Sequence, residues 1–250
     1  MQINGVTIDD SFAEAFPMKA TRLVITAHNA TWAMHAALSA TGFATSVIGC
    51  GAECGIERVL DAGATPDGRP GVAILLFSMS GKELARQVER RVGQCVLTCP
   101  TTAVVKGVGG GNLLLLATGT DEALAGAEAA VAAMRRVPNV IMPFPGGVVR
   151  SGSKVGSKYA GLSASTNDAF CPSLTGLALR SELDEHTRCV LEIVIDGLAD
   201  ADVAAAMRAG IAAVTGRGAG AGVTRISAGN YGGKLGPFHF HLRELAPGGG

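Results

Sequence analysis

The spacing of apolar residues along the chain predicts strands that alternate with helices. Mostly apolar runs predict strands at residues 22–27, 45–50, 71–77, 112–118 and 190–197. Leu84, Val88 and Val92 recur every four residues, which predicts an amphipathic helix at 81–94 after a helix near 30–41. The stretches GVTRISAG and PFHFHL predict two further strands near the end of the chain.

Two Ala-rich segments carry apolar stripes at helical spacing. The first stripe is Leu124, Ala127, Val131 and Met134, with Pro138 after its end, and the second is Val203, Met207, Gly210 and Val214. Residues 121–147 and 200–233 also follow the same course, from helix to short strand to a Gly-Gly pair. This similarity reflects either a duplication or the shared composition of Ala-rich helices. The pattern predicts an α+β fold with a first part at 1–142 and a second at 143–250.

Composition and charge narrow the class of protein. The chain has 250 residues, 48% hydrophobic and 17% charged, which is typical of a globular protein with a sizeable core. Lys plus Arg and Asp plus Glu number 21 each, so nucleic acid and membrane surfaces are not expected partners. No apolar stretch approaches the ~20 residues of a membrane-spanning helix, and MQINGVTIDD does not resemble a signal peptide. We therefore expect a cytoplasmic protein.

The predicted strand VLEIVIDG carries a carboxylate at its centre. Because side chains alternate along a strand, Glu192 shares a face with Val190 and Val194. An unpaired buried carboxylate is costly or takes up a proton. Two interpretations follow: Glu192 faces water from an edge strand, or it is a functional acid with a raised pKa.

Four segments rich in glycine or in small polar residues are candidates for binding loops. KGVGGGN (106–112) could cradle a phosphate or form a tight backbone turn, but it lacks the Lys-Ser/Thr of a P-loop. The segments 143–161 and 227–236 are rich in Gly and also contain Ser and Lys, and the segment 164–173 contains Ser, Asn and Asp. They are either surface loops or the walls of a site, with Lys154 and Lys158 facing an anionic substrate.

The cysteines and histidines give weak signals for chemistry. The pairs Cys50/Cys54 and Cys95/Cys99 each enclose three residues, unlike a common zinc knuckle, and we expect free thiols. His239 and His241 share a strand face but have no apparent third ligand, so no metal site is expected.

Motifs in a fixed order resemble one family. GQCVLTCPT, PFPGGVVRSGSKVGSK, ASTNDAFCP, CVLEIVIDG and SAGNYGGKLG are similar to segments of formylmethanofuran:tetrahydromethanopterin formyltransferases, as are NGVTIDDSFAEAF and TPDGRPGV. The bacterial one-carbon oxidation form of the family is the nearer match. The resemblance covers nearly the whole chain. It implies two ferredoxin-like α/β lobes related by duplication, with the first shortened near residues 100–107, where family members have several tens of residues more.

The resemblance also implies an activity and a site. The enzyme would move a formyl group between N5 of tetrahydromethanopterin and a methanofuran-type amine, with these carriers as substrates and no prosthetic group or metal. Glu192 would be the catalytic acid that stabilises the oxyanion of a tetrahedral intermediate. The substrate-binding residues would be Ser153, Lys154, Ser157, Lys158, Asn167, Asp168, Asn230, Tyr231 and Lys234.

The expected assembly of the chain and its alternative functions follow from the same resemblance. The resemblance implies a homo-oligomer, or a subunit of a formyltransferase/hydrolase complex. A non-catalytic structural subunit of that complex is the main alternative, and a module that binds the pterin or furan carrier without transfer is a weaker one. A thioester route through Cys171 or Cys189 would need an activating His, and no motif places one nearby.

Overall fold

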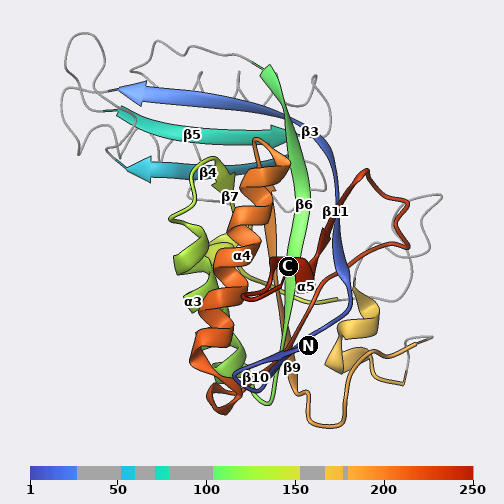
Figure 1. The fold of residues 1–250 in the computed structure, drawn as a ribbon. Helices are drawn as coiled ribbons and strands as arrows, with labels where there is room; N and C mark the ends of the chain where they lie inside the picture. Colours follow the sequence, from blue (N-terminus) through green and yellow to red (C-terminus); the bar gives the residue numbers. More distant parts are fainter. Residues whose placement is uncertain (27–51, 60–70, 79–103, 153–166, 177–179, 250) are drawn as a thin grey trace.

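A computed structural model describes residues 1–26, 52–59, 71–78, 104–152, 167–176 and 180–249 of the chain (Figure 1). Its strands are β1 (Gln2–Ile3), β2 (Val6–Ile8), β3 (Phe12–Thr26), β4 (Ala52–Val59), β5 (Gly71–Ser78), β6 (Val104–Ala117), β7 (Val140–Ile141), β8 (Val149–Arg150), β9 (Cys189–Gly197), β10 (Val223–Ser227) and β11 (Phe238–His241). Its α-helices are α3 (Thr120–Met134), α4 (Asp200–Arg217) and α5 (Leu242–Leu245). Short 3-10 turns are η1 (Pro145–Gly147), η2 (Asp168–Phe170), η3 (Pro172–Leu174) and η4 (Ala219–Ala221).

The described strands form one large mixed sheet. Along its main path the order is β1-β2-β10-β6-β3-β5-β4. Strand β9 pairs with β6 on one side and with β7 and β8 on the other, and β11 pairs with β3. The pairings are antiparallel except for β2 with β10. The fold is therefore mixed α/β with few helices.

The two long helices cover one face of the sheet and bury the core. Figure 1 shows α3 and α4 side by side next to β6 and β9. Ile193 and Ile195 of β9 and Leu113 and Leu115 of β6 point to this face and are fully buried beneath the helices. The opposite face of the same strands carries Leu114, Leu116 and Val190, which pack against Phe170 and Leu183 of the loops. The sheet thus has a helix-covered face and a loop-covered face.

Most predicted elements within the described residues are confirmed. The stripe of α4 is buried at all four predicted positions, and the alternation of β9 has the predicted facing. The predicted apolar stripe of α3 is buried at three of its four positions. The fourth, Leu124, is 44% exposed, because the buried face of the helix centres on Ala123, Ala127 and Ala130. The predicted elements at 30–41, 45–50 and 81–94 lie outside the described residues.

The glycine-rich segment 106–112 is neither a phosphate cradle nor a turn. It lies inside β6, where the register with β9 shifts between Val108 and Gly111. Gly110 has a left-handed φ of 95°, as such a bulge requires. A side chain at Gly109 would overlap Met18, since its Cβ would lie 1.7 Å from the Met18 Sδ. The glycines therefore serve close packing and a β-bulge.

The expected division between residues 142 and 143 does not separate two sheets. Strand β7, before this point, pairs with β9, and β8, after it, pairs with the same strand. The strands on the two sides of this expected boundary are therefore joined through β9 in one sheet.

None of the described helices is long and apolar enough to cross a membrane.

Candidate functional site

Glu192 lies in the interior of the sheet and not at its edge. On β9 it faces Leu114 of β6 on one side and Val149 of β8 on the other. Ser227 of β10 pairs with Leu114 in turn, so Glu192 and Ser227 belong to one cross-strand row. β9 is therefore not an edge strand at Glu192, and the interpretation of Glu192 as a residue of an edge strand is wrong.

The surroundings of Glu192 favour its protonated form. The residue is half-buried, and the burial of its carboxyl group raises the pKa to about 7. A hydrogen bond with the side chain of Asn167 opposes this shift but does not cancel it. Near neutral pH, Glu192 is therefore partly a carboxylic acid, which can donate a hydrogen bond where a carboxylate cannot.

A polar cleft of about 650 Å³ opens on the loop-covered face beside Glu192. Four predicted binding residues line it: Asn167, Asp168, Asn230 and Tyr231. Glu192 does not line the cleft itself, but Asn167 lines the cleft and contacts Glu192. The cleft thus extends to the side chain that hydrogen-bonds the acid.

The remaining predicted binding residues divide into two groups. Lys234 is exposed on the same segment as Asn230 and Tyr231, but it does not line the cleft. Ser153, Lys154, Ser157 and Lys158 lie outside the described residues.

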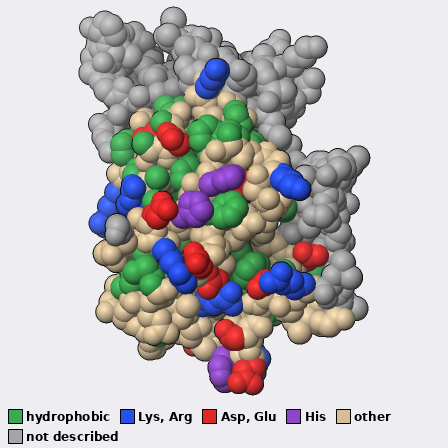
Figure 2. All heavy atoms as spheres, turned by 45° about the vertical axis from the view of Figure 1, so that its right-hand side comes forward, with side chains coloured by type: hydrophobic (Ala, Val, Ile, Leu, Met, Phe, Trp, Pro, Cys, Tyr) green, Lys and Arg blue, Asp and Glu red, His purple; other side chains and the backbone are tan. Residues whose placement is uncertain are grey.

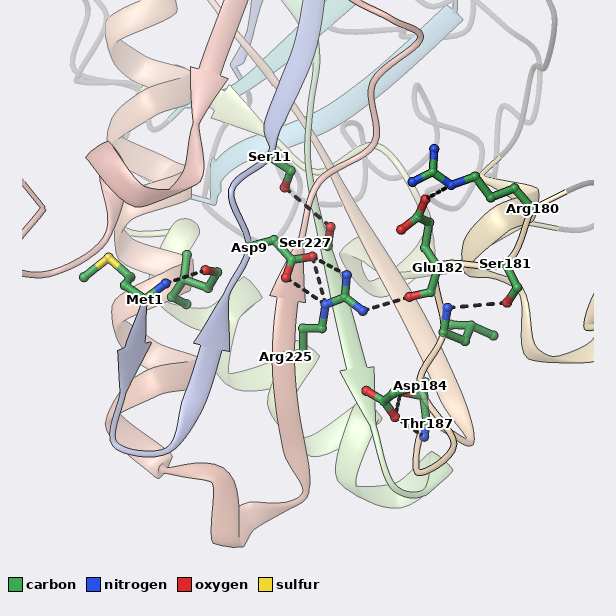
Figure 3. A network of polar contacts seen from close by, with 12 residues as sticks. Met1, Asp9, Ser11, Arg180, Ser181, Glu182, Asp184, Thr187, Arg225 and Ser227 are labelled. Carbon is green, nitrogen blue, oxygen red and sulfur yellow. Dashed lines mark hydrogen bonds and ion pairs between the residues drawn. The ribbon is translucent and has the colours of Figure 1, made fainter.

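An ion-pair network forms one wall of the cleft (Figure 3). The Arg225 Nε donates to both carboxylate oxygens of Asp9, at 2.7 and 2.9 Å, and its Nη1 donates to the backbone oxygen of Glu182 at 2.8 Å. Arg180 pairs with the side chain of Glu182 at 2.6 Å. The hydrogen bond to Asp9 raises the pKa of Arg225 further, so its charge is fixed. This network ties the loop at 180–187 to β10.

Two buried polar residues that hold the cleft wall were not among the predicted site residues. Glu14 of β3 is 1% exposed and accepts hydrogen bonds from the backbone of the 231–236 segment. Asn112 of β6 is 6% exposed and exchanges two hydrogen bonds with Gly229, at 2.6 and 3.1 Å. A charged residue in the apolar strand segment FAEAF was the signal for Glu14, but its partners lie more than 200 residues away.

A second acid on β9 shares the raised pKa of Glu192. Asp196 is 1% exposed, and burial raises its pKa to about 7 although its Oδ1 accepts from the Gly110 N–H at 2.9 Å. Its Oδ2 has no hydrogen-bond partner among the described residues. Asp196 does not line the cleft.

The thiols and imidazoles of the described segments form no reactive cluster. Cys171 is buried, with its Sγ 3.5 Å from the Gly152 oxygen and 3.3 Å from the Ser173 Oγ, and neither partner is a base. His239 and His241 are exposed and pack near the Phe12 ring, at centroid distances of 4.8 and 5.2 Å. On this side of the molecule, Figure 2 shows imidazoles beside apolar side chains, with acidic and basic groups intermixed. Within the described residues, no group of three or more His, Cys, Asp or Glu could hold a metal ion.

These features define a mixed α/β protein in which an acid of raised pKa lies beside a polar ligand cleft. The chain matches the family model described as formylmethanofuran-tetrahydromethanopterin formyltransferase over residues 1–122, and the model described as its proximal lobe over residues 96–245. It therefore belongs to the formylmethanofuran–tetrahydromethanopterin formyltransferase family.

Individual relatives cover the chain almost completely. The formylmethanofuran–tetrahydromethanopterin formyltransferase of Methylococcus capsulatus is 57% identical, with 98% of this chain and 99% of the relative aligned. That alignment spans 297 positions although this chain has 250 residues, so this chain lacks at least 47 of them (297 minus 250). The gap agrees in size with the several tens of residues expected to be missing.

Two solved structures share the fold. One is the formyltransferase/hydrolase complex of Methylorubrum extorquens with methylofuran, with a TM-score of 0.84, 42% identity and 98% coverage of both chains. The other is the formyltransferase of Methanosarcina barkeri, with a TM-score of 0.80, 41% identity, and coverage of 98% of this chain and 100% of the other.

Proposed function

We propose that this chain is a formyltransferase that moves a formyl group between N5 of tetrahydromethanopterin and the amine of a methanofuran-type carrier. Both carriers are substrates, and the chemistry needs no prosthetic group. Family membership and the names of the relatives support the reaction. The proposed catalytic role rests on one observation: the carboxyl group of Glu192 has a raised pKa and hydrogen-bonds a residue that lines the cleft.

The proposed reaction is direct acyl transfer. An amine attacks the formamide carbonyl of the donor, the carbonyl oxygen gains negative charge, and the tetrahedral intermediate collapses as the donor nitrogen leaves with a proton. Neutral Glu192 donates a hydrogen bond to the charged oxygen. One preorganised donor of this kind is typically worth ~2.7–4 kcal/mol of the activation barrier.

The cleft is the proposed place where a carrier approaches Glu192. Asn167 and Asp168 on one side, and Asn230 and Tyr231 on the other, supply polar groups for the part of the carrier near the reacting atoms. Ser153, Lys154, Ser157, Lys158 and Lys234 are proposed to contact more distant parts of the carriers.

Two lobes related by duplication are part of the proposal. The order β10-β6-β9-β7, with α3 and α4 on one face, matches the ferredoxin-like βαββαβ arrangement and supports one such unit. This unit takes strands from both sides of residue 142, and the match to the proximal lobe begins at residue 96. A boundary near the start of β6 is therefore better supported than the expected one at 142 and 143.

Assembly with other subunits is also proposed. A structural relative is part of a formyltransferase/hydrolase complex, which supports the same role here alongside a homo-oligomer. The free thiols of Cys171 and Cys189 suit a cytoplasmic location. A non-catalytic subunit remains the alternative, and it predicts no transfer by the purified chain in either condition below.

A transfer assay with both carriers, with and without candidate partner subunits, tests the proposal. We expect Glu192→Gln to lower turnover by at least ~10², because the amide keeps one donor but loses the acidic proton that the oxyanion can share; carrier binding should change little. Asp196→Asn is the matched control, since it alters an acid on the same strand whose hydrogen bond is with Gly110, a residue that does not line the cleft. Near-normal turnover of folded Glu192→Gln would remove Glu192 from the mechanism.

A further inference from the structure

The carboxylate of Glu14 lies beneath the segment that forms one wall of the cleft. Its Oε2 accepts hydrogen bonds from the backbone N–H groups of Tyr231 at 2.9 Å and Gly233 at 3.2 Å. Its Oε1 accepts from the N–H groups of Leu235 and of Gly236, the latter at 3.0 Å. Four backbone donors of one short segment therefore converge on a single side chain.

Glycines allow the segment to adopt this shape. Gly232 and Gly233 have left-handed φ values of 76° and 71°, which turn successive N–H groups towards the same side. Gly236 lies so close to β3 that an added Cβ would be 2.1 Å from the Ala15 oxygen. The segment is thus a concave anion-binding nest, and its anion is the carboxylate of Glu14.

The hydrogen bonds keep Glu14 charged. Burial alone would raise its pKa, but the four backbone donors together lower it below the ordinary value. The nest is therefore filled at neutral pH, and it is not a site for an external phosphate.

A continuous series of contacts leads from this segment to Glu192. Asn112 fixes Gly229, two residues before the 231–236 segment, through two hydrogen bonds. The position that a Cβ of Gly229 would take is 2.4 Å from the Asn167 Oδ1, so its backbone packs directly against Asn167. Asn167 in turn hydrogen-bonds Glu192.

We propose that Glu14 is a positioning residue for carrier binding, because its carboxylate holds the nest at 231–236 and thereby sets the cleft wall formed by Asn230 and Tyr231. This role rests on the proposed transfer reaction. Glu14 does not line the cleft, so it acts through the backbone it binds and not by contact with the carrier.

Two substitutions separate a missing anion from a distorted loop. Glu14→Gln keeps the volume but turns an amide N–H₂ towards N–H donors, so the nest cannot close. Glu14→Ala empties the nest and leaves room for acetate, whose methyl and carboxylate groups replace the atoms removed. Asp202→Asn is the matched control, because the Asp202 carboxylate also accepts a backbone N–H bond, from Ala199 at 3.0 Å, and Asp202 does not line the cleft.

Steady-state kinetics with each carrier varied in turn is the readout. We expect KM for one carrier to rise at least about tenfold in both Glu14 variants, with a much smaller change in kcat, as loss of uniform binding requires. Added acetate should lower KM in a saturable way for Glu14→Ala but not for Glu14→Gln. Asp202→Asn should keep the wild-type KM.

Each contrary result overturns the inference. An unchanged KM in folded Glu14 variants, an equal rise in Asp202→Asn, or a Glu14→Ala defect that acetate does not relieve would each do so. If the wild-type chain transfers no formyl group, the proposed function fails instead. Glu14 is then judged by the dissociation constants of the carriers, measured by calorimetry for the same three variants with and without acetate.

Discussion

The pH dependence of turnover provides a sharp test of the role of Glu192. The structure places two acids with a pKa of about 7 on the same strand, Glu192 and Asp196, and only Glu192 contacts a cleft-lining residue. If the neutral acid stabilises the oxyanion, the active fraction of the enzyme halves at about the pKa and then falls tenfold for each further pH unit.

The expected magnitude follows from the pKa. At pH 9, roughly a hundredth of the Glu192 population is neutral. The wild-type kcat should therefore fall by ~10² between pH 6 and pH 9, which is the order of effect expected for loss of one oxyanion donor. At high pH the wild-type rate should approach that of Glu192→Gln, because both then lack the acidic proton.

The assay is kcat at saturating carriers from pH 5 to pH 9 for three proteins. Glu192→Gln should lose the alkaline decline, whereas Asp196→Asn should keep it. Any change that arises from ionisation of the attacking amine persists in all three proteins and can be subtracted. The role of Glu192 would be refuted if Glu192→Gln kept the alkaline decline of kcat seen in the wild type. It would also be refuted if the decline disappeared only in Asp196→Asn.

Two predictions concern stability. Asp196 has a folded-state pKa raised from 3.8 to about 7, so the folded chain holds a proton that the unfolded chain releases, and stability falls as pH rises between these values. Asp196→Asn should remove this loss, so that its effect on the free energy of unfolding is more favourable at pH 8 than at pH 4 by up to ~4 kcal/mol. Urea denaturation at the two pH values measures this difference, and an equal effect at both would contradict the raised pKa. Gly109→Ala should destabilise the protein by ~1–3 kcal/mol, because its Cβ would overlap Met18. By contrast, Gly216→Ala in α4, where no atom lies within 4 Å of the added Cβ, should stabilise it by ~0.5–1 kcal/mol; the same sign for both in thermal melts would argue against the packing at β6.

Local patterns in the sequence determined the type and facing of several elements. The stripe of α4 and the alternation of β9 follow from helical and strand periods, which depend only on neighbouring residues and on burial of one face. The resemblance to the formyltransferase family assigned Asn167, Asp168, Asn230 and Tyr231 to substrate binding, and these residues line the cleft. Local periodicity, by contrast, gave them no role. It could not decide whether Glu192 faces water, since that depends on which distant loop residues cover its face of the sheet.

Only the tertiary structure decided the features that depend on distant pairing. Val149 closes the open side of β9 and places Glu192 within the sheet, which raises its pKa by desolvation. The donors to Glu14 lie 217 to 222 residues away, and no local period contains such a contact. The glycines of 106–112 had suggested a phosphate loop or a turn, but Met18 of β3 and Val203 of α4 lie too close to Gly109 and Gly111 for a Cβ at either position. Sequence periodicity thus defines which face of an element is buried, whereas the partner across that face, and with it the charge state of a buried acid, is set by the assembled sheet.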